Sequence, residues 1–473
     1  MVIWLEKEHM LYMYVYRMVL SDIYNGKYQF QDKLPTLLEL CKIYSVGRNT
    51  VRSALIQLQN DGYVIMQKGV QATVCFQLDS FENQRQYKQA IQDSRQMIID
   101  IFETMEYLLP NISVVCLHRM TPEQFFELEN KVNQFSIDCI KSEKEMIQEL
   151  YNIYLYAFSI LDNSLLNDLF ITFMSSIYQP LIDTEDAHSE LKRNIKLIQR
   201  TLKFLLKFAN RQNDFMVKHI IAIMCKSNAK IALKYIDELC EDMDVQNEKQ
   251  FVWVGYRNQD YLYVQVVLKI LSAIQHQTYV KGISLPSIAK LSKQYDVSEK
   301  TVRKALDVLR EYCVIETING VGSIVIVDNH YDKSVLFNSP SFQENMKVFS
   351  ESLELILLIL PIMMIKVLES ASYQDLVSIK DKTEADSLLT LEPLYDYVAA
   401  HCNPCLKTIF EELKKPMGWN IFVGRVVHYS AYDLKEHHSE YFNAILSRDT
   451  YRLCQIVDSI FQSSLKTLQL HMK

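Results

Sequence analysis

The chain has 473 residues, of which 49% are hydrophobic, with only ten Gly, ten Pro and a formal net charge of −7. This length allows two to four domains, and the scarcity of Gly and Pro favours a helix-rich globular protein over a disordered or collagen-like one. A negative net charge provides no general attraction for nucleic acid, so any DNA contact must come from a locally basic face.

Neither the start of the chain nor its longest apolar stretch predicts a membrane protein. The first nine residues carry acids where a signal peptide would be basic and then apolar. The longest apolar stretch, residues 353–368, contains Glu354, Pro361 and Lys366, so we expect a buried helix that is too short and too interrupted to span a bilayer. Ten scattered cysteines fit reduced thiols. We therefore expect a cytoplasmic protein with no membrane partner.

The first predicted module covers residues 10–76. An amphipathic helix is expected over 10–24, and Leu34-Pro35-Thr36 then marks a helix start, because Pro restricts φ and Thr36 can cap the helix. After a short turn at 45–47, apolar residues at helical spacing predict a second helix over about 48–58. Two β-like runs, 63–67 and 72–76, are joined by a Gly-containing loop and predict a hairpin.

The same pattern occurs again 251 positions later. A helix is expected over 261–275, Leu285-Pro286-Ser287 marks the next helix start, and a further helix is expected over about 299–309. The hairpin strands are expected at 314–318 and 323–327. The letters T-V-R-x-A-L are identical in both copies, and the two copies align without a gap. One structural unit of three helices and a wing therefore occurs twice.

This unit predicts a winged helix-turn-helix, in which the second helix of the pair enters the DNA major groove. Arg on its outer face can bind guanine, Asn can bind adenine, and Thr or Lys hold phosphates. Residues 34–74 carry four basic and two acidic side chains. The predicted DNA-contacting residues are Thr36, Arg48, Asn49, Thr50, Arg52, Lys68 and Gly69 in the first copy, and Ser287, Ser298, Lys300, Thr301, Arg303, Lys304, Gly320 and Gly322 in the second.

Both segments resemble the DNA-binding domain of the GntR family of bacterial transcription regulators, whose pattern is roughly L-P-S-E-R-x-L-A, V-S-R-x-T-V-R-x-A-L-x-x-L and G-x-G-T-x-V. The resemblance implies sequence-specific DNA binding, with departures. An Arg of the family is Leu38 here and Ala289 in the second copy, and the Arg retained as Arg48 becomes Glu299. The second wing glycine is Gln71 in the first copy. Since a carboxylate repels phosphate but can accept from cytosine, we expect the first module to bind DNA more strongly and the two to read different half-sites.

The remaining sequence predicts helices throughout. They are expected at 98–109, 123–142, 145–161, 191–210 and 215–239, and residues 335–473 show similar periodicity. The predicted fold is mainly α with small β wings: two winged helix-turn-helix domains, each followed by an all-helical bundle. We expect four domains, at 1–78, 79–248, 249–330 and 331–473, the two helical ones being effector or dimerisation domains.

A second resemblance concerns the helical blocks. Asn163-Ser164-Leu165-Leu166 and Asn403-Pro404-Cys405-Leu406 are similar to an N-P-L-L turn in the helical effector domain of the FadR-like branch of this family. That branch also has an H-x-x-x-x-x-A-I-x-x-x-D run. In the second block it is matched by His438, Ala444, Ile445 and Asp449, and in the first by Ala222 and Ile223, with Met216 and Ser227 replacing the His and Asp. This resemblance implies a whole regulator duplicated and fused. The alternative, that all helical bundles share such periodicity, has about equal weight.

No catalytic or cofactor site is predicted. The FadR-like branch often binds a metal through an Asp and three His, but only His438 falls on a matching His position, so it is a weak candidate and no metal is expected. Cys402 and Cys405 form a single C-x-x-C around Asn-Pro, which favours a pair of structural thiols in a turn. No phosphate loop, zinc-protease motif or nucleophile elbow occurs, so the chain is not expected to be an enzyme.

Two functions follow from these observations. The first is a sequence-specific transcription regulator whose two modules read two half-sites of double-stranded DNA, while the helical domains set their spacing and bind an unidentified small-molecule effector. The alternative is a protein–protein interaction or scaffold protein with degenerate winged helices, motivated by Leu38, Ala289, Glu299 and the acidic net charge. The sequence leaves open whether the chain acts alone or as a homodimer.

Overall fold

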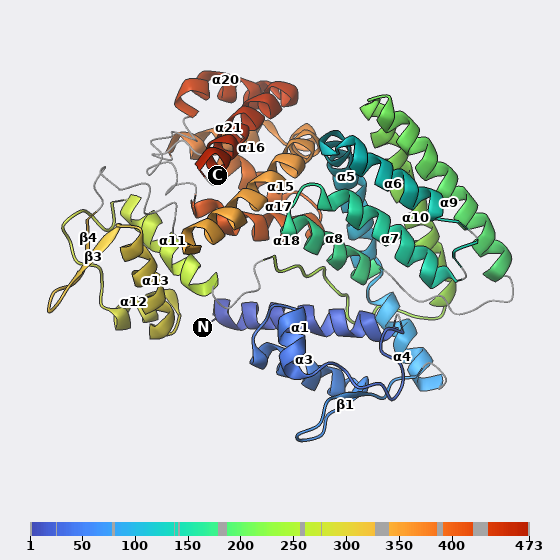
Figure 1. The fold of residues 1–473 in the computed structure, drawn as a ribbon. Helices are drawn as coiled ribbons and strands as arrows, with labels where there is room; N and C mark the ends of the chain where they lie inside the picture. Colours follow the sequence, from blue (N-terminus) through green and yellow to red (C-terminus); the bar gives the residue numbers. More distant parts are fainter. Residues whose placement is uncertain are drawn as a thin grey trace. The chain divides into compact units, whose positions relative to one another are not determined.

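A computed structural model describes all residues except 1, 25, 78–80, 137, 141, 178–186, 256–260, 276, 327–339, 386–390, 420–433 and 472–473. The chain forms two compact units. The N-terminal unit comprises His9–Gly255 with Asn403–Thr408, and the C-terminal unit comprises Met1–Glu8, Tyr256–Cys402 and Ile409–Lys473. Each unit is mainly helical and holds one two-stranded antiparallel sheet, as predicted (Figure 1).

The first module has the three predicted helices and the wing. They are α1 (Val2–Tyr24), α2 (Leu37–Ile43), α3 (Arg48–Asn60), β1 (Val64–Ile65) and β2 (Thr73–Val74). Thr36 caps α2 as expected, and α3 buries the predicted stripe of Val51, Ala54, Leu55 and Leu58. The strands are shorter than predicted, since β1 pairs with β2 only at Val64↔Val74 and Ile65↔Thr73.

The second module repeats the backbone of the first. It consists of α11 (Tyr261–Gln275), α12 (Ile288–Tyr295), α13 (Glu299–Glu311), β3 (Ile315–Ile318) and β4 (Gly322–Val325). Ser45 and Asp296, which are 251 positions apart, both have φ of 52° at the turn between the two helices. The bridges Lys33↔Thr73 and Ser284↔Ile324 also correspond. Of the strand predicted at 323–327, Val327 lies outside the described residues.

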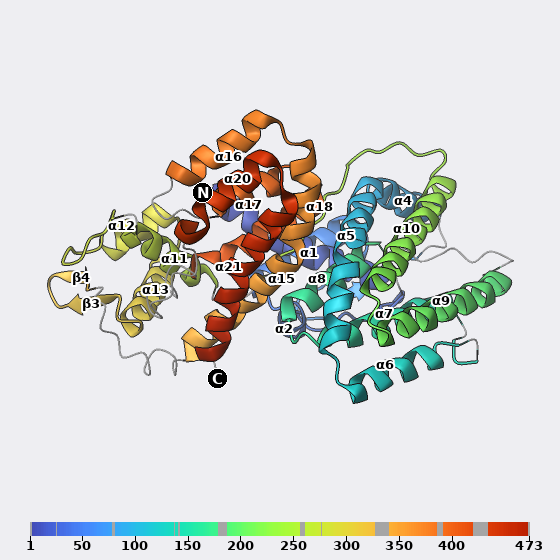
Figure 2. The ribbon, with the colours of Figure 1, turned by 90° about the horizontal axis from the view of Figure 1, so that it is seen from above.

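The helical bundle of the N-terminal unit has seven helices among its described residues. These are α4 (Phe81–Gln92), α5 (Arg95–Arg119), α6 (Pro122–Gln134), α7 (Glu143–Ser159), α8 (Ser164–Ile177), α9 (Ala187–Asn210) and α10 (Asp214–Leu239). The prediction of one helix over 123–142 was wrong, because α6 ends at Gln134 and the buried Phe135 leaves helical geometry with ψ of 82°. Helix α5 packs along α10, and α9 packs against both α6 and α10 (Figure 2).

The helical bundle of the C-terminal unit is built around one long helix. Its described helices are α15 (Pro340–Ser370), α16 (Tyr373–Ala385), α17 (Glu392–Ala400), α18 (Pro404–Lys414), the short 3-10 turn η1 (Lys415–Gly418), α20 (Leu434–Ser447) and α21 (Thr450–His471). The part of α18 up to Thr408 belongs to the N-terminal unit. The expectation that this apolar stretch is too short to span a bilayer was wrong, because α15 continues through Pro361 and is long and apolar enough for a span. Its residues Leu355, Ile356 and Ile359 are fully buried, which fits the core helix that was predicted.

The two bundles share one order of helices. Helices α5 and α15 end 251 positions apart, at Arg119 and Ser370, and each contains a proline, Pro110 or Pro361. Helices α6 and α16 also cover ranges 251 positions apart. Later, α9 and α10 pair as α20 and α21 do, and both α10 and α21 pack on the long helix of their bundle. The two bundles therefore share the order of their helices, in addition to the repeated winged modules.

This correspondence corrects one part of the sequence comparison. His438, Ala444 and Ile445 lie on α20, whose counterpart is α9, whereas Ala222 and Ile223 lie on α10. The environments also differ, because Ile445 is fully buried and Ile223 is 49% exposed. The run that contains Ala222 and Ile223 is therefore not the structural counterpart of the run that contains His438, Ala444 and Ile445. The counterpart of Asp449, which caps α21, is Asn213, which caps α10.

An irregular segment, residues 241–255, follows α10 and is fastened to the N-terminal unit. The Lys249 backbone N–H donates to the Asp93 carbonyl at 2.8 Å, at the turn between α4 and α5. Further along, the fully buried Trp253 donates from Nε1 to Asp168 Oδ2 of α8 at 2.8 Å. The segment leading to the second module is therefore held in place by its own unit.

Candidate nucleic-acid interface

The first module presents an open basic face on α3. Arg48, Asn49 and Arg52 are exposed and lie opposite the buried stripe that holds α3 against the rest of the module, while Thr50 is half-buried. Within the part of the chain that the structure describes, no ion pair involves Arg48 or Arg52. Two guanidinium groups four residues apart, without acids, form a face that attracts an anion.

Thr36, the N-terminal cap of α2, takes part in a capping box. Thr36 accepts from the Glu39 N–H at 3.3 Å, while Glu39 Oε2 accepts from the Thr36 N–H at 2.7 Å and the Thr36 hydroxyl at 2.8 Å. These hydrogen bonds lower the pKa of the Glu39 carboxyl. Thr36 remains exposed, so the capping box sets the helix start at the predicted contact position.

The wing tips of both modules depend on glycine. Gly69 and Gly320 each have φ of +80°, a left-handed conformation that side chains rarely adopt, and Gly322 has φ of +113°. Lys68 lies beside Gly69 and is exposed. Gln71, which occupies the position of Gly322, does not have a positive φ. The two wings therefore share the backbone conformation at Gly69 and Gly320 but differ two residues later.

The second module uses the same helix with different chemistry. Ser298 caps α13 by accepting from the Thr301 N–H at 3.1 Å, and its hydroxyl lies 2.8 Å from that of Thr301. Arg303 Nη2 is 2.9 Å from Glu299 Oε2, so the arginine equivalent to Arg52 is already paired within its own helix. Such a pair weakens the attraction of this face for phosphate.

The lysines of this face also differ from one another. Lys304 Nζ lies 4.3 Å from the ring centroid of Tyr263 on α11, so this predicted contact residue is drawn back toward its own module. Lys300 is exposed, and Ser287 caps α12 by accepting from the Lys290 N–H at 3.4 Å. Residues 285–325 carry six basic and five acidic side chains, against four and two in residues 34–74.

The other sequence candidates do not form a site among the described residues. His438 is half-buried on α20, and its ring meets Phe442 edge-on at 4.5 Å between centroids. No three His, Cys, Asp or Glu side chains of the described chain gather as metal ligands. Cys402 lies in the turn between α17 and α18, Cys405 lies in the first turn of α18, and both are free thiols.

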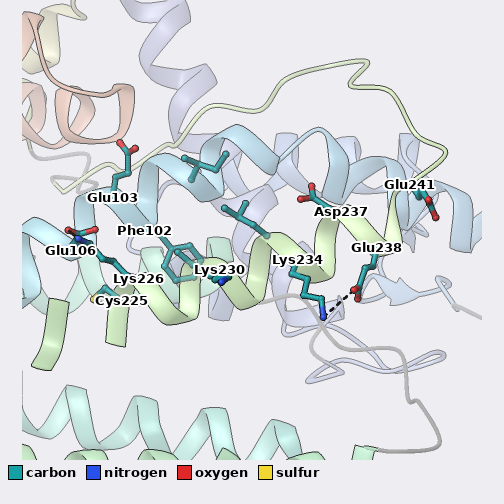
Figure 3. A pocket seen from close by; sticks show the side chains of 13 residues that line it. Phe102, Glu103, Glu106, Cys225, Lys226, Lys230, Lys234, Asp237, Glu238 and Glu241 are labelled. Atoms are coloured by element: carbon teal, nitrogen blue, oxygen red, sulfur yellow. Dashed lines mark ion pairs between the residues drawn. The ribbon is translucent and has the colours of Figure 1, made fainter. Parts of the chain in front are cut away.

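A groove that no sequence motif marks lies between α5 and α10, with a volume of about 730 Å³ (Figure 3). Phe102 and Cys225 are its buried residues, and burial raises the pKa of the Cys225 thiol to about 12. Lys226 of α10 pairs with Glu106 of α5 at 3.1 Å across the groove. A second cavity of about 610 Å³ lies where α5, α6 and the start of α10 meet, beside the His118–Asp214 pair. Both could admit a small molecule.

The geometry defines two winged helix-turn-helix modules, a class of domain that places its second helix in the DNA major groove. The family model described as "Bacterial regulatory proteins, gntR family" matches residues 11–74 and 262–325. The chain therefore carries two GntR-family domains, as its motifs predicted. Helical residues outside these two ranges are not part of the match.

Two curated relatives support the same assignment of the modules. An uncharacterized HTH-type transcriptional regulator, YurK, of Bacillus subtilis is 44% identical over 59 residues, which are 12% of this chain and 24% of that protein. A probable fructoselysine utilization operon transcriptional repressor of Escherichia coli K12 is 42% identical over 60 residues, 13% of this chain and 25% of that protein. The chain thus spans about a quarter of the length of these curated relatives. A solved Streptococcus agalactiae GntR structure covers 46% of this chain and 98% of its own, at 16% identity and a TM-score of 0.23.

Proposed function

We propose that this protein is a cytoplasmic, sequence-specific DNA-binding transcription regulator that reads an operator of two unlike half-sites. The observation that carries the proposal is the repetition of one DNA-binding backbone at a constant offset, with an exposed recognition face in both copies. Because both faces belong to one chain, every molecule carries two DNA-binding modules in a ratio of one to one. Half-sites about one helical turn or a multiple apart follow from this arrangement.

The proposed contacts are those predicted from the sequence. In the first module Arg48, Asn49 and Arg52 face the bases and phosphates from α3, with Thr36, Thr50, Lys68 and Gly69 around them. In the second module Lys300 and Arg303 take this place, with Ser287, Ser298, Thr301, Lys304, Gly320 and Gly322. Support comes from the exposure of the two arginines and Lys300, and from the absence of ion pairs to Arg48 and Arg52 within the described chain.

The helical domains, about 79–248 and 331–473, hold the modules and respond to a ligand in this proposal. The groove between α5 and α10 and the cavity beside His118 are the candidate effector sites. A ligand there acts only if it prefers one spacing of the modules over another. The repeated helix order supports the view that the chain is a duplicated and fused regulator equivalent to a dimer.

Selection of bound duplexes from a random pool tests the proposal, with the full-length protein beside Arg52→Ala and Arg303→Ala. An enriched bipartite site, of which each variant loses a different half, is the expected result. A direct contact to guanine is worth about 1–3 kcal/mol per base pair, which such a selection resolves. No enrichment at low salt, with either the intact protein or its variants, would contradict DNA reading.

The competing function is a protein-binding module, and the Glu299–Arg303 pair is the observation that favours it for the second copy. Enrichment that is lost only with Arg52→Ala would assign DNA binding to the first module and leave the second for another role.

A further inference from the structure

The hairpin of helices α9 and α10 has a charge pattern unlike the rest of the chain. The two helices and their connection, residues 187–239, contain eleven Lys or Arg and four acids, Glu190, Asp214, Asp237 and Glu238, although the whole protein has a net charge of −7. The equivalent helices of the C-terminal bundle, residues 434–471, carry four basic and four acidic residues. The basic surface is therefore a property of the N-terminal bundle alone, and it lies outside both DNA-binding modules.

The bases of α9 form one continuous line. Lys192, Lys196, Arg200, Lys203 and Lys207 follow at intervals of three or four residues, so they share one side of the helix over about 22 Å. All five are exposed, and none has an ion pair within the described part of the chain. A row of unpaired cations on one helix makes the local electrostatic potential positive, and this surface therefore attracts an anionic partner.

Exposed apolar side chains accompany this line. Leu197 and Phe204 of α9 are 62% and 48% exposed, and Ile223 and Ile231 of α10 are 49% and 66% exposed. Gln199 donates to the carbonyls of Val132 and Asn133 on α6, which shows which side of α9 faces α6.

At 100° per residue, Leu197 and Phe204 lie about 140–160° from Gln199, which places them on the side of α9 that is turned away from α6. Helices α9 and α10 pack against each other, and both carry exposed apolar residues.

A second basic rim lies on α10. Lys226, Lys230 and Lys234 recur every four residues and line the groove between α5 and α10, where Lys226 pairs with Glu106 of α5; Lys234 pairs with Glu238 of its own helix. Exposed apolar residues of both helices, which we call the seam, therefore accompany the basic line of α9 and the lysines of α10, which we call the rims. We refer to Leu197, Phe204, Ile223, Ile231 and these two sets of bases as the α9–α10 surface.

We propose that the α9–α10 surface is a docking site for an acidic amphipathic helix of a partner protein. Two packed helices are 8–10 Å apart, which matches the apolar stripe of one further helix lying in their groove. The charges complement each other, because acids that flank the apolar stripe of the partner meet bases on both rims. Lys and Arg are longer than Leu and Ile, so the rims stand above the seam, as suits a helix in a groove rather than a flat lipid surface.

Fluorescence anisotropy with the full chain tests this site. The probe is a labelled 18-residue peptide with Leu at positions i, i+3, i+4 and i+7 and Glu elsewhere, and the control probe has the same composition in scrambled order. We expect micromolar binding of the amphipathic peptide and at least tenfold weaker binding of the scrambled one. Leu197→Ser/Phe204→Ser and Arg200→Glu/Lys203→Glu should each weaken binding at least tenfold. The exposed Lys382 of α16 supplies the control Lys382→Glu, which should leave binding unchanged.

Circular dichroism of each variant checks the fold of the bundle, which we expect to be unchanged because the altered side chains are all exposed. Equal binding of the scrambled peptide would overturn the proposal, because it would show attraction by charge without use of the seam. Phosphatidylglycerol vesicles and a random 20-base-pair duplex are tested in the Arg52→Ala/Arg303→Ala background. If either binds through the rims while the amphipathic peptide fails to compete, the surface recognises lipid or nucleic acid instead. Loss of operator binding alone leaves this proposal unaffected, since the modules are separate from it.

Discussion

Replacing Glu299 with Ala tests the account of the second module most directly. Glu299 and Arg303 form an exposed pair at 2.9 Å, and such a pair on a helix contributes about 0.3–0.5 kcal/mol. The substitution frees Arg303 for DNA and removes a carboxylate from a face that would approach phosphate. Together we expect tighter binding to the selected duplex by about 1 kcal/mol, or roughly fivefold. The plot of log affinity against log salt concentration should become steeper, by up to the release of about one further counterion.

Titration of the selected duplex at several salt concentrations measures this effect. Asp307→Ala is the matched control, because Asp307 pairs with Arg310 at 2.8 Å on the same helix but two turns further from the end that meets the bases. We expect less than a twofold change for the control. Weaker binding of Glu299→Ala would refute the reasoning, because it would mean that Glu299 itself accepts a hydrogen bond from DNA, as a cytosine contact requires.

Three further changes test the scaffold. Trp253→Phe removes the hydrogen bond from Trp253 Nε1 to Asp168 in a fully buried position, so urea unfolding should lose about 1–3 kcal/mol; an unchanged midpoint would show that the segment 241–255 is not anchored there. Burial lowers the pKa of Lys249 to about 8 from an unfolded value of 10.5, so stability should rise from pH 8 to 10.5 and be lost again on acidification, and Lys249→Met should flatten this rise in unfolding experiments. Gly320→Ala has room for its Cβ but not the φ of +80°, so we expect a loss of about 1 kcal/mol and weaker duplex binding, whereas binding equal to the parent protein would exclude a wing contact.

The winged modules could be predicted in detail because their signals are local. Pro after Leu, a capping Thr or Ser, the apolar stripe of the second helix and the wing glycines each act within a few residues, and they recur at one offset. Only the strand lengths and the start of α1 differed. The pairing of Glu299 with Arg303 also follows from their spacing of four residues on one helix.

The bundles show what periodicity leaves undecided. Apolar spacing predicts that a segment is helical, but helix ends depend on which neighbours bury the last turn, so 123–142 was predicted too long and the helix around 353–368 too short. Periodicity also does not show which helices correspond in the two bundles. For that reason the sequence comparison aligned the run at 216–227, on α10, with the run at 438–449, which begins on α20, the counterpart of α9.

The sequence by itself determined the repeated modules, their family resemblance and the clustering of charge in 187–239, because these reside in the order of residues. Tertiary structure alone decided which side of α9 meets α6, and therefore that Leu197 and Phe204 remain exposed beside unpaired bases. It also decided the groove between α5 and α10, since a cavity depends on how two distant helices pack. Local propensity acts over a few residues, whereas burial depends on every element that packs around a side chain.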